Sequence, residues 1–144
     1  NKKWQILLNM KKRWFWEGKY NWAWWKVEKK ETIIEWALRE LKEETWVLLN
    51  KKDLKKKWIL HFYFENKSEW NQDVTLFTSY DYDWDVFETS EMKPYWFNIK
   101  DIPYNKMWED DEIWLPRILS WENYIEYDFN FWEDWKIKSY NLIK

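Results

Sequence analysis

The most informative stretch of this chain is Trp25-Lys26-Val27-Glu28-Lys29-Lys30-Glu31, followed after seven residues by Arg39-Glu40-Leu41-Lys42-Glu43-Glu44-Thr45-Trp46-Val47. Residues 32–44 carry apolar side chains at the three- and four-residue spacing of an amphipathic helix. Thr32 is a suitable first residue for such a helix, and glycine at position 46 would end it. We therefore expect a helix over residues 32–44.

Three glutamates crowd one face of this expected helix. Glu40, Glu43 and Glu44 stand at positions i, i+3 and i+4, so their carboxylates lie within about one helical turn. Like charges this close repel, and a cation that gathers them would explain the arrangement. Carboxylate oxygens suit the hard ions Mg2+ and Mn2+. The alternative is a solvated surface helix with pairs such as Glu35 with Arg39 and Arg39 with Glu43.

The charged positions fit a known motif once two tryptophans are exchanged. With glycine at Trp25 and Trp46, the stretch becomes G-x5-E-x7-R-E-U-x-E-E-x-G-U, where U is aliphatic. This pattern resembles the Nudix box of metal-dependent hydrolases, which cleave nucleoside diphosphates linked to another group. The resemblance implies a structural role for positions 25 and 46.

The same resemblance implies a catalytic centre on the helix. Glu43, Glu44 and the backbone carbonyl of Trp24 would bind the metal, with Glu40 in the same acidic cluster. The metal would neutralise the diphosphate and orient an attacking water, and one of the glutamates could take the proton of that water. Arg39 and Glu31 would hold the preceding loop against the helix, and Lys26 would approach a phosphate.

The composition offers a reason for the exchanged positions. The chain has 17 Trp and 1 Gly in 144 residues, whereas glycine usually makes up about 7% of a protein. Trp96, Trp108 and Trp114 stand where the family also carries Trp, and the others stand where glycine is expected, as in the hairpin-like Phe131-Trp132-Glu133-Asp134-Trp135-Lys136. We hypothesise a gene whose UGA codons mean glycine, translated with UGA as tryptophan; UGG codons would exclude this. The alternative is a Trp-rich protein that stacks sugars or bases.

The rest of the chain interleaves strand-like and helical segments. The pattern predicts an α/β or α+β protein with a mixed β-sheet between helices, the Nudix fold. We expect a single Nudix domain over residues 1–144 that lacks its first N-terminal strand, because residues 5–10 match the second strand of the family. Strands are predicted at 5–10, 57–64, 73–80, 92–99, 124–131 and 136–143, a second helix at 110–121, and a long loop at 13–25.

Outside the motif, the chain is similar to the oxidised purine nucleoside triphosphate hydrolases, the 8-oxo-dGTP diphosphatases of this family. The similarity rests on Met10-Lys11-Lys12-Arg13 with Phe15, on Asn21, and on the run from Glu91 to Asp111. It implies Mg2+-dependent cleavage of 8-oxo-dGTP or 2-hydroxy-dATP to the monophosphate and pyrophosphate, which sanitises the nucleotide pool and so serves DNA repair.

The similarity also implies a base pocket. Asp110 and Asp111 would bind the purine edge, one of them protonated so that the pair can both donate and accept hydrogen bonds. Trp108 would stack on the base, and Asn21 would hydrogen-bond it. Taken singly, Trp108 also fits a core position and Asp110 a helix cap. The other implied contacts are Lys11, Phe15, Phe62 and Met92 to the substrate and Glu91 to an auxiliary metal or water.

The charge and composition of the chain limit the classes of binding partner that we expect. The 24 basic and 26 acidic residues leave a net charge of −2 that is mixed along the chain, so no footprint for a nucleic acid polymer exists. The lack of Cys excludes thiolate catalysis, and no apolar run has the length of a membrane span. We expect a cytoplasmic monomer. The remaining alternatives are a Nudix pyrophosphatase of another nucleoside diphosphate derivative and an inactive Nudix-fold or Trp-rich binding module.

Overall fold

The structure, a computed structural model, forms two compact units. Unit 1 comprises residues 1–54 and 79–108, and unit 2 comprises residues 55–78 and 109–144. None of the helices in the described ranges combines the length and apolar character that a membrane span requires. The described residues are 5–12, 17–21, 32–45, 47–79, 85–90, 92–120 and 122–144, with the backbone alone at 11, 44, 45, 56 and 57.

Unit 1 contains a three-stranded antiparallel sheet in the order β2-β1-β5. The expected strands at 5–10 and 92–99 are confirmed as β1 (Gln5–Lys11) and β5 (Met92–Asn98). The third strand, β2 (Tyr20–Asn21), lies inside the segment expected to be a loop, because two residues are too few to show an alternating pattern. Tyr20 packs edge-on against Tyr95 and Phe97 of β5.

Helix α1 (Ile33–Thr45) confirms the helix predicted from the opening stretch. A capping box begins it: the Glu35 carboxylate accepts hydrogen bonds from the backbone N–H and the hydroxyl of Thr32, and the Thr32 hydroxyl accepts one from the Glu35 N–H. Trp36, on the apolar side, is buried. Short 3-10 helices elsewhere in unit 1 are η2 (Lys51–Asp53), η4 (Ile99–Asp101) and η5 (Tyr104–Lys106).

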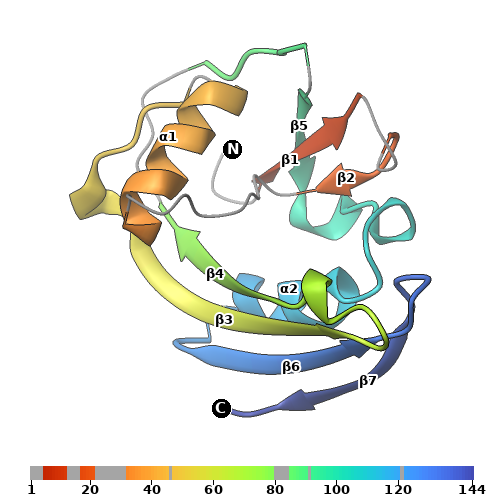
Figure 1. The fold of residues 1–144 in the computed structure, drawn as a ribbon. Helices are drawn as coiled ribbons and strands as arrows, with labels where there is room; N and C mark the ends of the chain where they lie inside the picture. The colour runs from red at the N-terminus through yellow and green to blue at the C-terminus, as the bar shows by residue number, and fades with distance from the viewer. Residues whose placement is uncertain are drawn as a thin grey trace. The chain divides into compact units, whose positions relative to one another are not determined.

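Unit 2 is built on a strongly curved four-stranded mixed sheet in the order β4-β3-β6-β7, visible in yellow, green and blue in Figure 1. β3 and β6 are parallel, and the outer pairs are antiparallel. This is the mixed sheet that the sequence predicts; the separate sheet of unit 1 was not predicted. The elements are β3 (Lys55–Phe64), η3 (Ser68–Trp70), β4 (Gln72–Thr78), α2 (Asp111–Leu119), β6 (Ile125–Phe131) and β7 (Ile137–Leu142).

The core of unit 2 follows from strand alternation. Every second residue of β6, from Ile125 to Phe131, is buried, and the residues between them are half-buried. Helix α2 lies against the concave side of the sheet (Figure 1), and its Arg117 donates a hydrogen bond to the Tyr127 hydroxyl of β6 at 2.7 Å. The same guanidinium donates two hydrogen bonds to the Glu122 carboxylate, and this pair stabilises the end of the helix.

The tryptophans suspected to replace glycine behave differently from one another. Trp135, in the turn between β6 and β7, has φ of +66°, a backbone conformation that a bulky L residue rarely adopts and glycine adopts freely. Trp58 instead is buried in the core of unit 2, an environment that suits a large apolar side chain. The glycine hypothesis therefore stays a prediction, with structural support at position 135.

Candidate active site

The acidic face of α1 is organised by one arginine. A single Arg39 nitrogen lies 2.7 Å from a Glu40 carboxylate oxygen and 3.2 Å from a Glu43 carboxylate oxygen. Glu35 does not pair with Arg39, because its carboxylate is engaged in the capping box. The two glutamates thus converge on one positive group, and position 44 follows in the same helix.

Two of the residues expected to contact the substrate belong to one face of the unit 1 sheet. Asn21 of β2 is paired with Asn9 of β1, which is paired in turn with Pro94 of β5. Met92 lies two residues before Pro94, so its side chain is on the same face, and it is paired with Lys11 in the β1 register. Met92 is fully buried, and Asn21 is half-buried.

Trp108, the expected stacking platform, is half-buried at the end of unit 1. The ammonium of Lys19 lies 4.6 Å from the centre of its ring and also donates to the Met107 carbonyl at 3.3 Å. A cation on an indole face is attractive because of the ring's negative quadrupole. Lys19 therefore holds the Trp108 ring in place.

Asp110 and Asp111, the expected base-binding pair, are both buried in unit 2. Asp110 is the residue before α2, but its side chain does not cap the helix. Its carboxylate accepts a hydrogen bond from the Trp114 indole N–H at 2.9 Å instead. Burial raises the pKa of Asp110 to about 6; the Trp114 hydrogen bond opposes this rise, and the neighbouring Glu109 charge adds to it. A carboxyl with such a pKa can carry its proton near neutral pH.

The remaining expected contact in unit 2, Phe62, lies among aromatic rings. Its ring is edge-on to Phe129 at 5.8 Å and to Phe131 at 5.4 Å. His61 on the same strand is half-buried, and its two ring nitrogens contact the carboxylates of Asp73 at 2.6 Å and Glu126 at 2.9 Å. No expected catalytic residue takes part in this bridge.

Several expected site residues fall outside the described residues, so their predicted roles stay predictions. They are Phe15, Trp24, Trp25, Lys26, Glu31, Trp46 and Glu91. Among the residues that the structure describes with side chains, no group of three or more His, Asp or Glu has the geometry to hold a metal ion. The described part of the expected metal site is therefore the pair Glu40 and Glu43.

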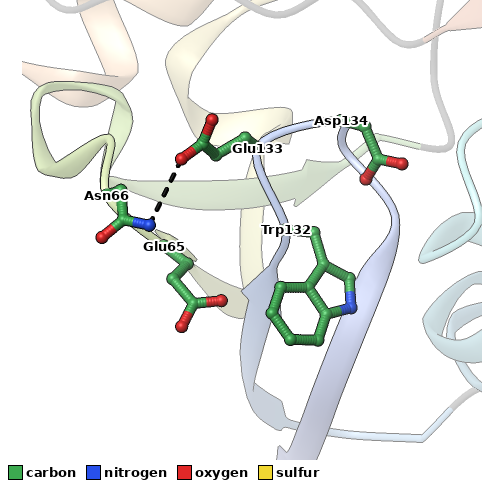
Figure 2. A pocket seen from close by; sticks show the side chains of 5 residues that line it. All are labelled: Glu65, Asn66, Trp132, Glu133 and Asp134. Atoms are coloured by element: carbon green, nitrogen blue, oxygen red, sulfur yellow. Dashed lines mark hydrogen bonds between the residues drawn. The ribbon is translucent and has the colours of Figure 1, made fainter.

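An open pocket of about 470 Å³ lies in unit 2, at the turns that follow β3 and β6. Figure 2 shows its five lining side chains, among which Asn66 donates a hydrogen bond to Glu133 at 3.2 Å. The Lys138 ammonium lies over the largely exposed Trp132 ring, 4.4 Å from the ring centre. None of the residues expected at the active site lines this pocket.

Three residues that contact or neighbour the expected site residues were not assigned a role from the sequence. Lys19 had no distinguishing pattern, since its contact with Trp108 joins distant parts of the chain. The bond of Trp114 to Asp110 had a signal, because the two are four residues apart at the start of a predicted helix. Asn9 also had one, as an amide between the apolar residues Leu8 and Met10.

Two solved structures share this fold. The chain superposes on a MutT protein from Bacillus halodurans with a TM-score of 0.84 at 22% sequence identity, covering 98% of this chain and 91% of that one. For a Nudix hydrolase from Nitrosomonas europaea the TM-score is 0.67 at 20% identity, covering 89% and 73%. These similarities establish the fold.

Sequence relatives establish the family. The chain is 38% identical over 123 residues to the oxidized purine nucleoside triphosphate hydrolase of Danio rerio, covering 85% of this chain and 77% of the relative. It is 36% identical over 138 residues to the Mus musculus protein of the same name, covering 96% and 86%. The chain belongs to the Nudix hydrolase family. No family model matches the sequence, although the charged positions of the Nudix box are all present.

Membership of this family establishes the class of chemistry. This Nudix hydrolase is an enzyme that cleaves its substrate with water, and Nudix hydrolases generally depend on a divalent metal ion. The donor set fits such an ion, because Glu40 and Glu43 offer hard carboxylate oxygens that already meet at a positive group. The α1 face is therefore the candidate catalytic surface.

Proposed function

We propose that this Nudix hydrolase cleaves oxidised purine nucleoside triphosphates, such as 8-oxo-dGTP or 2-hydroxy-dATP, to the monophosphate and pyrophosphate. The enzyme would sanitise the nucleotide pool as a cytoplasmic monomer that acts on free nucleotides rather than on a nucleic acid polymer or a membrane. The curated relatives bear the name of this activity at 36% and 38% identity. The single observation that carries the proposal is the buried pair Asp110 and Asp111.

The buried pair supports recognition of a purine edge. Asp110 has a pKa of about 6 because burial penalises its charged form, so a neutral carboxyl is accessible near physiological pH. A neutral carboxyl donates a hydrogen bond, whereas an ionised neighbour accepts one. Asp110 and Asp111 could then contact a base edge that presents both an acceptor and a donor. Trp108 and Asn21 would add stacking and a further hydrogen bond, with Phe15, Phe62 and Met92 as apolar walls.

The face of α1 would perform the hydrolysis. Glu40, Glu43, Glu44, the Trp24 carbonyl and Glu91 would hold Mg2+, for which Mn2+ could substitute. When bound, the ion supplies charge neutralisation on the polyphosphate and activation of a water molecule. One of the clustered glutamates would take the proton of the attacking water, while Arg39 keeps Glu40 and Glu43 oriented, as its two contacts indicate. Lys11 and Lys26 would contact the phosphates, and Glu31 would hold the loop beside the helix.

Pyrophosphate release tests the proposal. The purified protein is incubated with 8-oxo-dGTP, 2-hydroxy-dATP or dGTP in Mg2+, beside a version in which the suspect tryptophans are glycines. We expect the highest kcat/KM for an oxidised purine, and no release after chelation of the metal. Release from none of the three, with release from a nucleotide sugar or another nucleoside diphosphate derivative, would replace this substrate class by another one of the family. Size-exclusion chromatography with light scattering tests the monomer.

A further inference from the structure

The centre of the unit 1 sheet holds an unsatisfied polar group. Asn9 of β1 is only 3% exposed, and among the described residues its side-chain oxygen Oδ1 has no hydrogen-bond partner. Leaving a buried acceptor unpaired costs about 1–3 kcal/mol, so native proteins rarely do so without a reason. A ligand that brings a donor to this oxygen would be such a reason.

The position of Asn9 indicates which ligand. Asn9 is the register partner of Asn21, the residue proposed to hydrogen-bond the base, and of Pro94. Register partners in an antiparallel pair project from the same face of the sheet. Leu8 and Met10 project from the opposite face, where Met10 is paired with Tyr20. The unpaired oxygen is thus beside Asn21 and on the face proposed to meet the purine.

The chemistry of the oxygen selects a donor. A carboxamide Oδ1 only accepts hydrogen bonds, so its partner must carry an N–H or O–H. An intact purine has an acceptor at N7, whereas oxidation at C8 places a hydrogen there and turns N7 into a donor. An intact purine at this place would set two acceptors against each other, and the oxidised purine would satisfy the orphan oxygen.

We propose that Asn9 is a specificity-determining residue, whose Oδ1 accepts a hydrogen bond from the N7–H of a purine oxidised at C8. This inference rests on the proposed function of the chain. The residue would act as a means of selection that responds only to the oxidised five-membered ring. Sites built to hydrogen-bond a substrate group discriminate strongly against analogues that lack it, because their own polar atoms are then left unpaired.

The test replaces the amide by an apolar side chain of similar shape, in Asn9→Leu. We expect kcat/KM for 8-oxo-dGTP to fall about 10-fold or more, while the values for dGTP and 2-hydroxy-dATP, whose N7 is an acceptor, should not fall and should rise if N7 and Oδ1 repel each other. The melting temperature should not fall, since the variant removes a buried unpaired acceptor. A lower melting temperature with unchanged selectivity would mean that Asn9 is only structural, and would overturn the inference.

A matched control comes from Thr78 in unit 2. Its hydroxyl oxygen is likewise buried without a partner among the described residues, but it lies on β4 and not on the unit 1 sheet. Thr78→Val should leave the selectivity among the three nucleotides unchanged. Equal loss of selectivity in both variants would show a general effect of core substitution and would contradict the role of Asn9.

A substrate analogue tests the same bond without any mutation. In 7-deaza-8-oxo-dGTP a CH2 group replaces the N7–H, so the unmodified enzyme should lose about 10-fold in kcat/KM relative to 8-oxo-dGTP. An unmodified enzyme that treats the two alike overturns the inference, even if Asn9→Leu does not fold. An enzyme that hydrolyses none of these nucleotides refutes the proposed function itself, and the inference with it.

Discussion

The carboxyl groups of α1 and those at the start of α2 exist in opposite surroundings. On α1, the Glu43 side chain is 59% exposed and the Glu40 side chain 15% exposed, and both contact the guanidinium of Arg39. At α2, Asp110 and Asp111 are 6% and 2% exposed, and Asp110 accepts its hydrogen bond from a neutral indole. The difference is consistent with two proposed roles for carboxyl groups: the exposed ones on α1 would be ionised and bind a cation, and a neutral one at α2 would donate a hydrogen bond to the base.

The largest expected effect concerns the charge on α1. Glu44→Gln keeps the shape of the side chain but removes its charge, so we expect kcat to fall by roughly 10²–10⁴-fold, the range typical for loss of a catalytic acid–base or metal-binding group. The measurement is pyrophosphate release over a Mg2+ titration. Full activity in this variant would show that α1 is a solvated surface helix after all.

The matched control lies on the same helix. Glu35 is also a glutamate of α1, but its carboxylate serves the capping box with Thr32. Glu35→Ala should lower the melting temperature slightly and leave kcat unchanged. If Glu35→Ala were as inactive as Glu44→Gln, loss of helix structure rather than loss of a ligand would explain both results.

The second effect concerns the proton on Asp110. Its pKa rises from 3.8 unfolded to about 6 folded, so its favourable contribution is complete below pH 3.8 and is lost as the pH rises through 6. The free energy of unfolding should therefore fall as the pH rises from 3.8 through 6, with a full contribution of roughly 3 kcal/mol from this group. Asp110→Asn, which is neutral at every pH, should flatten this slope in urea titrations. A slope that survives the substitution would assign the proton elsewhere.

Features that depend on local sequence could be predicted, whereas features that depend on contacts between distant segments could not. Helix α1 was predictable within one residue at each end, because its apolar spacing, its capping threonine and its charges are all local. The alternation of β6 was predictable for the same reason. The bridge of His61 to Asp73 and Glu126 was not, because it joins three strands whose register only the folded sheet sets.

The candidate site likewise has parts that the sequence predicts and parts that it does not. The acidic positions of α1 can be recognised in the sequence from their helical spacing. The pair Asp110 and Asp111 can be recognised because the two residues are adjacent. The burial that raises the pKa of Asp110 depends on packing of distant segments, which no local pattern reports. Asn9 is similar: its amide between two apolar residues was visible in the sequence, but its pairing with Asn21 appears only from the strand register.

A smaller effect concerns the hairpin attached to the start of α2. The backbone N–H of Ile137 donates to the Glu109 carboxylate, next to Asp110, and Trp135 lies two residues before Ile137. Its φ of +66° costs a bulky residue roughly 1–2 kcal/mol, which its ring contacts with Phe64 and Trp70 offset in part. Trp135→Gly should therefore raise the free energy of unfolding by about 1 kcal/mol.

Trp132 provides the control for this substitution. Its indole is exposed in the same turn, but its φ is not positive. Trp132→Gly should bring no gain in stability in thermal melts. If Trp135→Gly destabilised the protein more than Trp132→Gly, aromatic packing would outweigh backbone strain, and position 135 would count against the glycine hypothesis.

The smallest effect concerns a third kind of carboxylate, paired with a histidine. Burial alone would lower the pKa of His61, but its hydrogen bonds to Asp73 and Glu126 and their charges raise the pKa above 6.5. The contribution of this bridge is complete below pH 6.5 and is lost as the pH rises through the folded pKa. The melting temperature should fall by about 2 °C above pH 6.5, and His61→Gln should remove this fall but keep the slope below pH 6. Loss of both slopes in this one variant would mean that Asp110 and His61 titrate as one system, and the contrast between exposed and buried carboxyls would then be incomplete.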